Sequence, residues 1–356
     1  MANYNGHLNS NEIFAAIYNM IISQQVFADN IKGTNSKLVD KARVDGGLYG
    51  DTKLYYATDA LKSAAWGNDA EAENLLELHR PQAPKCQAIT LDVFRQIRLT
   101  VDNYLSKRAF ATEGAFSNFN TVMKGWINDT KKIYDSTTYN SYVGTAETAT
   151  GNQTITLTLP TDTDAEKQAR LQGQYIAKEV ADLLVDLTDV SRDYNDYGFI
   201  RSYNPEDLMF VWNADAVNEI TKMDLPTIFH KDALISKLGE YTLPAKYFGT
   251  VNSGTKPGDD TTVRSLVEQE IGSHHYFAGD IIATGDTAPA GTSYTQNDNI
   301  LFKIIHKDSI PYMSAFEVGT SFFNPRSLTE TNYLTFGHNT LQYLKDKPLI
   351  TVKKNA

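Results

Sequence analysis

The sequence of 356 residues contains one cysteine, Cys86, so neither a disulfide within the chain nor a cysteine-based metal cluster can form. Long apolar runs are also missing, because Gln24 and Gln25 interrupt the apolar N-terminal stretch well short of a membrane span. That stretch lacks the basic segment that opens a signal peptide. We therefore expect synthesis in a reducing cytoplasm and no membrane association, and we interpret Cys86 as a small apolar residue in or beside a strand.

Positive charge is scarce. The chain has 33 Lys and Arg residues against 43 Asp and Glu, which gives a formal net charge of -10, and no long basic block is present. A protein that binds nucleic acid tightly through its phosphates normally carries a basic excess. A hydrophobic content of 41% and a charged content of 21% are those of an ordinary folded protein, and the length allows two or three compact units.

Motifs of catalysis are missing or incomplete. No G-x-S-x-G motif of serine hydrolases occurs. Gly254-Thr255-Lys256 lacks the spacing of a phosphate-binding loop, and Pro257 stands where Ser or Thr should bind Mg²⁺. His274 and His275 are neighbours on a segment that we expect to be extended, where adjacent side chains point opposite ways, so they make a poor metal chelate.

Two further features invite an enzymatic interpretation. His-Lys-Asp triplets begin at His230 and His306, but they are contiguous and miss the His-x-Lys-x-x-x-x-Asp spacing of the phospholipase D superfamily. Asn213-Ala214-Asp215 separates an apolar strand from a helix, a place where α/β enzymes often keep catalytic groups. Either Asn213 or Asp215 can cap that helix, and we favour capping over a hydrolase site near Asp215. We therefore predict no catalytic, cofactor-binding or metal-binding residue.

The first third of the chain predicts extended structure on the outside of a fold. We expect an N-terminal helix capped by Asn9 and Glu12, and then a two-stranded ribbon. Its strands are "TKLYYAT" at 52–58 and one long strand, "CQAITLDVFRQIRLTV", at 86–101. Such a ribbon has little core of its own, so it must lie on its own body or on a neighbour.

A long helix should follow, with one apolar stripe that includes Trp126. The stripe consists of Phe116, Phe119, Met123, Trp126, Thr130 and Ile133. Gly125 within it suggests a kink or close packing. From Asp135 the sequence becomes polar and predicts a loop up to about residue 153.

The remaining elements predict a central sheet flanked by helices. A strand with alternating faces covers 154–160, and an amphipathic helix runs from about 164 to 190 with the stripe Ile176, Val180, Leu183, Leu184 and Leu187. A fully apolar strand covers 207–212. Residues 240–300 have a loop composition, and strands return from residue 300 to the end.

This order of parts resembles the major capsid protein of tailed bacteriophages, the Hong Kong 97-type fold. The segment "NPEDLMFVWNADAVNEITKMDLPTIFHKDAL" at 204–234 carries the resemblance most strongly, with "RLTVDNYLSKRAF" at 98–110 and "KPLITVKK" at 347–354. The resemblance implies an α+β fold with an N-terminal arm, an extended β-ribbon (E-loop), a P-domain with a spine helix and an A-domain with a central sheet. The expected bounds are 1–38 for the arm, 39–100 for the ribbon and its return strand, 101–162 for the P-domain, 163–300 for the A-domain and 301–356 for the return strands of both domains.

The resemblance implies a shell subunit that assembles into pentamers and hexamers around double-stranded phage DNA, in a virion made in the bacterial cytoplasm. It implies neither enzymatic activity nor a cofactor. Expected partners are other copies of the chain, a separate scaffolding protein, a portal, and decoration or head-fibre proteins, with only non-specific proximity to DNA. No residues match a triad for isopeptide crosslinking. The alternatives are an encapsulin-type nanocompartment, which shares the fold, and the hydrolase near Asp215.

Overall fold

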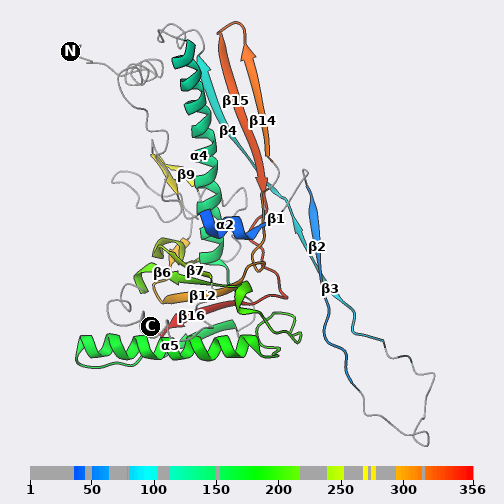
Figure 1. The fold of residues 1–356 in the computed structure, drawn as a ribbon, viewed down its shortest axis with the longest axis vertical. Helices are drawn as coiled ribbons and strands as arrows, with labels where there is room; N and C mark the ends of the chain where they lie inside the picture. The colour runs from blue at the N-terminus through cyan, green and yellow to red at the C-terminus, as the bar shows by residue number, and fades with distance from the viewer. Residues whose placement is uncertain are drawn as a thin grey trace, which may run out of the picture.

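The computed structural model describes residues 36–44, 50–63, 78, 80–102, 113–148, 153–216, 239–251, 268–271, 274–277, 294–314 and 317–355. A five-stranded sheet lies between helix α5 (Ala165–Thr188) and the lower end of helix α4 (Glu113–Thr145), as Figure 1 shows. A long three-stranded sheet rises beside α4, and a two-stranded ribbon extends away from the body in the opposite direction. The N-terminal helix predicted near Asn9 lies outside the described residues.

The five-stranded sheet has the order β5-β16-β12-β6-β7. Its strands are β5 (Thr154–Leu157), β16 (Leu349–Lys354), β12 (Ile300–His306), β6 (Leu208–Asn213) and β7 (Gly239–Leu243). The outer pairs β5–β16 and β6–β7 are parallel, whereas β12 is antiparallel to both of its neighbours. The predicted strands at 154, 207 and 300 are confirmed, and every residue of β6 and β12 is buried, as a sheet covered on both faces requires.

Helix α5 covers one face of this sheet. Its side chains Ile176, Val180, Leu183, Leu184 and Leu187 are all buried, so the predicted stripe is confirmed. They pack on alternate residues of the strands, such as Phe210 and Phe302. Asp164 is the N-cap, and its Oδ1 accepts the N–H of Glu166 at 3.0 Å.

The opposite face of the sheet packs against the second half of α4, the short helix α2 (Ser36–Ala42) and the 3₁₀ helix η4 (Ala245–Tyr247). This arrangement corrects the loop prediction for residues 240–300. That region contains β7 and η4, and it also contains β8 (Gly249–Val251), β9 (Glu268–Ile271), β10 (His274–Phe277) and β11 (Tyr294–Gln296). A composition rich in Gly, Thr and Asp is typical of loops, so these short strands could not be recognised from it.

Helix α4 corrects two further predictions. It continues to Thr145 through the segment predicted as a loop, and the residues from Tyr134 to Ala146 are all buried. Trp126, predicted to be buried, is 37% exposed, and Thr130 is exposed too. The buried face contains Ile127, Lys131 and Tyr134 instead. Replacing Trp126 should therefore cost the subunit little stability.

The polar half of α4 can be buried because its hydroxyl groups bond within the helix. The side chains of Thr137, Ser141 and Thr145 each donate to the carbonyl four residues earlier, at 2.7, 2.9 and 2.6 Å. Tyr139 and Tyr142 fill the core between these hydroxyls. A segment that is polar in composition thus leaves few polar atoms without partners.

The long strand predicted at 86–101 is in fact two strands in two sheets. β3 (Lys85–Thr90) pairs with β2 (Thr52–Ala57) in the ribbon, whereas β4 (Val93–Asp102) pairs with β15 (Thr329–His338). The break falls at Leu91 and Asp92, where the Asp92 carboxylate accepts the N–H and the hydroxyl of Thr340 at 2.8 and 2.9 Å. The predicted alternation holds across the break, because Ile89, Leu91 and Val93 are all buried.

The remaining strands complete the outer parts of the fold. β14 (Glu317–Asn324) is the outer strand of the three-stranded sheet β14-β15-β4. β1 (Arg43–Val44) pairs in parallel with β13 (Tyr312–Met313) and so attaches the segment after α2 to the core. None of the helices in the described ranges is long and apolar enough to span a membrane.

Two glycines in α4 provide a matched test of its contact with η4. A Cβ on Gly144 would lie 1.8 Å from the carbonyl oxygen of Tyr247, whereas a Cβ on Gly125 would meet nothing within 4 Å. We predict that Gly144→Ala lowers the free energy of unfolding by about 3 kcal/mol through forced backbone separation. Gly125→Ala should raise it by about 0.5–1 kcal/mol, because alanine favours the helix. Urea unfolding of unassembled subunits measures both, and equal effects of the two changes would contradict this close approach.

Candidate functional site: the ribbon base and the exposed apolar surfaces

The residues that suggested a hydrolase have structural roles. Asn213, at the end of β6, is buried; its amide nitrogen donates to the carbonyl of Ile300 at 2.9 Å. Its Oδ1 accepts the N–H of Asp215 at 3.2 Å, so the predicted capping role is confirmed for Asn213. Asp215 itself is exposed. Among the described residues, no group of three His, Cys, Asp or Glu side chains could hold a metal ion.

The structure describes three histidines of the other candidate motifs, His274, His275 and His306. His306 closes β12, and its Nδ1 accepts the N–H of Asp308 at 3.2 Å. Burial is the main cause that lowers the pKa of His306 to about 4, so the ring is neutral at pH 7. His274 and His275 lie on β10, in an extended segment as predicted. His230 and Gly254-Thr255-Lys256 lie outside the described residues. Cys86 lies on β3, as predicted, but it is exposed.

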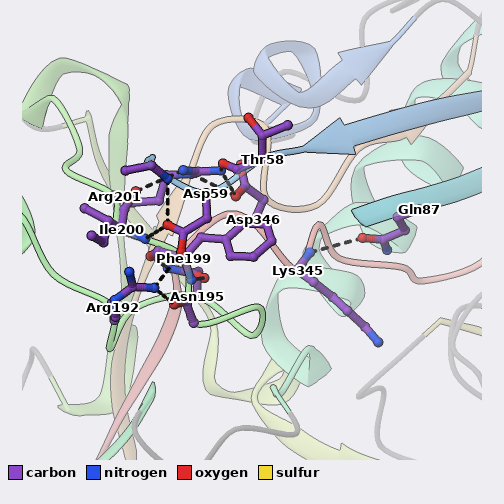
Figure 2. A network of polar contacts seen from close by, with 12 residues as sticks. Thr58, Asp59, Gln87, Arg192, Asn195, Phe199, Ile200, Arg201, Lys345 and Asp346 are labelled. Carbon is purple, nitrogen blue, oxygen red and sulfur yellow. Dashed lines mark hydrogen bonds and ion pairs between the residues drawn. The ribbon is translucent and has the colours of Figure 1, made fainter. Parts of the chain in front are cut away.

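A network of polar contacts fixes the point where the ribbon leaves the body (Figure 2). Asp59, two residues beyond β2, accepts the N–H of Ile200 at 2.9 Å and the guanidinium of Arg192 at 2.8 Å. These two donors are the largest causes that lower the pKa of Asp59 to about 2. Arg201 donates to the carbonyl of Thr58 at 2.7 Å and pairs with Asp346, also at 2.7 Å. Because the donors belong to the loop after α5, the ribbon is tied to the central-sheet unit.

A second contact holds the other strand of the ribbon. The side chain of Gln87 on β3 donates to the carbonyl of Tyr343 at 2.8 Å and accepts the N–H of Lys345 at 3.1 Å. Both ribbon strands are thus bonded to loops of the body, β2 through Asp59 just past its end and β3 through Gln87.

The two strands of the ribbon present one uncharged face to solvent. Leu54 and Tyr56 are 54% and 67% exposed, and Leu61 beyond them is 77% exposed. In the register of the hairpin, Leu54 is opposite Ala88 and Tyr56 is opposite Cys86, and both partners are exposed as well. Contiguous exposed apolar side chains on a projecting element are typical of a contact surface.

Strand β14 forms a second exposed apolar surface. All eight of its residues are exposed, and Phe322 and Phe323, being adjacent, point to opposite faces of the sheet. Leu328, in the turn after β14, is exposed and has a φ of 56°, an uncommon value for a residue other than glycine. One edge of β14 pairs with β15, and no strand in the described part of the chain pairs with its other edge.

Buried polar groups join α4 to the strands packed beside it. Asp135 of α4 is 1% exposed and accepts from Lys131 at 2.8 Å, Arg43 at 3.1 Å and the hydroxyl of Tyr312 at 3.0 Å. This cluster joins α4 to β1 and β13. The Nε2 of His338, at the end of β15, lies 2.8 Å from the hydroxyl of Tyr134 on α4. The two long elements are therefore bonded to each other through buried side chains.

Sequence reasoning did not find the residues of the ribbon base. Asp59 follows the end of a strand and starts a turn, which is a signal of local structure only. Its partners, the guanidinium of Arg192 and the N–H of Ile200, are more than a hundred residues away, and nothing in their spacing links them to it. The exposed apolar face of the ribbon, by contrast, was foreseen in outline, because the ribbon strands carry more apolar residues than the ribbon itself can bury.

The pKa of His306 predicts loss of stability in acid. Its folded-state pKa of about 4 lies below the value of 6.5 for the unfolded chain, so the unfolded chain binds more protons between these limits. The free energy of unfolding should therefore fall by about 2–3 kcal/mol as the pH decreases from 6.5 to 4. His306→Asn keeps an acceptor for the N–H of Asp308 and removes the titration, so its pH profile should be flatter. An unchanged slope in this variant, measured by urea unfolding, would refute the assignment.

The contacts of Asp59 predict that its loss loosens the ribbon base. We expect Asp59→Ala to speed hydrogen exchange of the Ile200 amide and of the β2–β3 amides while leaving those of β6 and β12 protected, because only the base loses its acceptor. Glu240→Ala, at an exposed acid on β7, is the control and should leave the ribbon unchanged. Equal exchange rates in both variants would show that Asp59 does not hold the ribbon.

Comparison with known proteins identifies the fold and the family. The capsid structure of Staphylococcus phage Andhra is similar over 94% of this chain and 87% of that one, with a TM-score of 0.63 and 11% identity. A structure described as the head fiber and inner core protein gp22 of native bacteriophage P68 is similar over 88% and 83%, with a TM-score of 0.57 and 11% identity. No curated protein matches the chain. At such identities these structures show the shared fold alone, a mixed α/β fold of phage capsids.

The profile of the Phi29-like phage major capsid proteins matches residues 4–352, nearly the whole chain. The expectation of a shell protein of the virion is thereby confirmed, and the hydrolase and nanocompartment alternatives are set aside, because the family is one of structural capsid proteins. The chain belongs to the Phi29-like phage major capsid protein family, whose members form the capsid shell.

Proposed function

We propose that this chain builds a shell of pentamers and hexamers around double-stranded phage DNA, with the ribbon as its main contact between copies. The uncharged face of the ribbon, with Leu54 and Tyr56 largely exposed, carries this proposal. Covering apolar surface contributes about 25 cal/mol per Å². A ribbon that is bonded to the body but has one apolar face exposed is suited to lie on a neighbouring copy.

The division of the chain follows the one expected from sequence. Residues 1–38 serve as the arm, 39–100 as the E-loop ribbon with its return strand, 101–162 as the P-domain, 163–300 as the A-domain and 301–356 as the return strands. Two observations support its outline, since β2 and β3 pair in a sheet of their own and α4 lies within 101–162. β4, although within the range of the ribbon, pairs with β15 in the long sheet.

Accessory proteins complete the assembly. We propose that a separate scaffolding protein directs shell formation, that a portal occupies one vertex, and that decoration or head-fibre proteins attach outside. A net charge of -10 supports only non-specific proximity to the packaged DNA, because an acidic lining does not bind phosphates. No catalytic residue, cofactor or metal takes part.

Substitutions on the ribbon face test its role. We expect the double change Leu54→Ser and Tyr56→Ser to leave subunit stability nearly unchanged, since both side chains are exposed in the subunit, and to reduce the yield of shells strongly. The measurement is negative-stain imaging after co-expression with the scaffolding protein, together with urea unfolding of the subunits. Tyr56→Phe keeps the apolar area and should assemble normally. A normal shell yield from the double variant would rule out the ribbon face as an essential contact.

A further inference from the structure

A small hole opens between α5 and the face of the central sheet. Its volume is about 120 Å³, several times what one water molecule needs. The floor is apolar and comes from three adjacent strands, with Leu157 of β5, Val352 of β16 and Phe302 of β12. These floor residues are at most 3% exposed, so they belong to the core, and the hole reaches down to it.

The wall formed by α5 is acidic. Glu179, Asp182 and Asp186 line the hole at spacings of three and four residues, which places them along one side of the helix. No basic residue is among the lining side chains. Asp186 accepts a long hydrogen bond of 3.4 Å from the hydroxyl of Tyr194 on the opposite wall. Lys178 contacts Asp182 at 3.3 Å from outside the hole, and both side chains are more than 60% exposed, so solvent weakens this pair.

The position of Asp186 works against the stability of the helix. It lies in the last turn of α5, which contains no basic residue, and Asp189 is the C-cap. Negative charge in the last turn of a helix opposes the helix dipole. A cation bound beside Asp186 would offset this unfavourable interaction.

We propose that this hole receives a lysine side chain from a separate, basic accessory protein of the capsid. The four methylene groups of lysine match the apolar floor, and its ammonium group would meet the carboxylates of Asp182 and Asp186 at the mouth. A separate protein fits better than a second copy, because each copy carries a net charge of -10 and the copies therefore repel one another. The proposal rests on the proposed function in one respect, that accessory proteins bind the shell.

Binding of a defined peptide tests the hole. The probe is a fluorescent, N-acetylated octapeptide of alternating lysine and leucine, and its anisotropy is measured with unassembled subunits and with imaged shells. Two variants remove different parts of the site. Asp182→Asn with Asp186→Asn removes charge, and Ile155→Phe fills the partly buried, apolar side of the hole without changing charge. Glu166→Gln, in the first turn of α5, is the charge-matched control.

We expect both site variants to weaken binding of the peptide at least tenfold, in subunits and in shells. Glu166→Gln should bind the peptide as the unchanged chain does, and a peptide with glutamate in place of lysine should not bind. If only the charge variant weakens peptide binding, the peptide binds a diffuse acidic surface and not the hole. If subunits bind the peptide but shells do not, another copy covers the hole. Either result overturns the proposal. No binding to well-formed shells overturns it too. Absence of shells for the unchanged chain would instead count against the proposed function, so the two failures are distinct.

Discussion

The contact on which the structure depends is the one between the end of α4 and the central sheet. Lys303 of β12 is completely buried, and its amine donates to the carbonyls of Gly144 and Ala146 at 2.8 and 2.7 Å. Burial lowers the pKa of this amine to about 7, a cost that the two acceptors reduce. The carbonyls at a helix end lack hydrogen-bond donors within the helix, so the amine of Lys303 supplies donors to these carbonyls and they supply acceptors to the buried amine. Gly144 lets the helix backbone come this close to η4.

This anchor matters because α4 is long and its second half is buried in the core. The long sheet β14-β15-β4 is bonded to α4 through Tyr134 and His338, and β1, which directly follows α2, is bonded to it through Arg43 and Asp135. The orientation of both parts therefore follows the orientation of α4. The ribbon is held by the Asp59 network and also by the core, because Ile89 of β3 packs with Met313 of β13 and with Leu344. Its attachment therefore depends on both the loop after α5 and β13.

The sequence allowed accurate prediction where the pattern of burial has a single period. Helix α5 and strand β6 meet this condition, since one packs by a 3.6-residue stripe and the other is buried on both faces. Helix α4 does not meet it. Its first half has apolar residues such as Trp126 that remain exposed in the subunit, and its second half is polar yet buried by hydroxyl bonds and tyrosines. The break between β3 and β4 depends on the distant Thr340, so it could not be predicted from the sequence either. The expected absence of a catalytic site rested on missing motifs, and it agrees with the family.

The distribution of aromatic residues separates what holds the subunit together from what joins copies. The chain has 20 tyrosines, of which Tyr139, Tyr142 and Tyr312 lie in the core. Other aromatic residues are exposed on outer strands, such as Tyr56 on the ribbon and Phe322 on β14. A net charge of -10 makes copies repel one another at a distance, whereas apolar contacts attract only when surfaces meet. The exposed apolar patches of the ribbon and of β14 are suited to supply such short-range attraction in the proposed shell. Because every copy in a closed shell is surrounded by neighbours, modest contacts add up around it, and an incorrectly placed copy that makes only one of them can still dissociate.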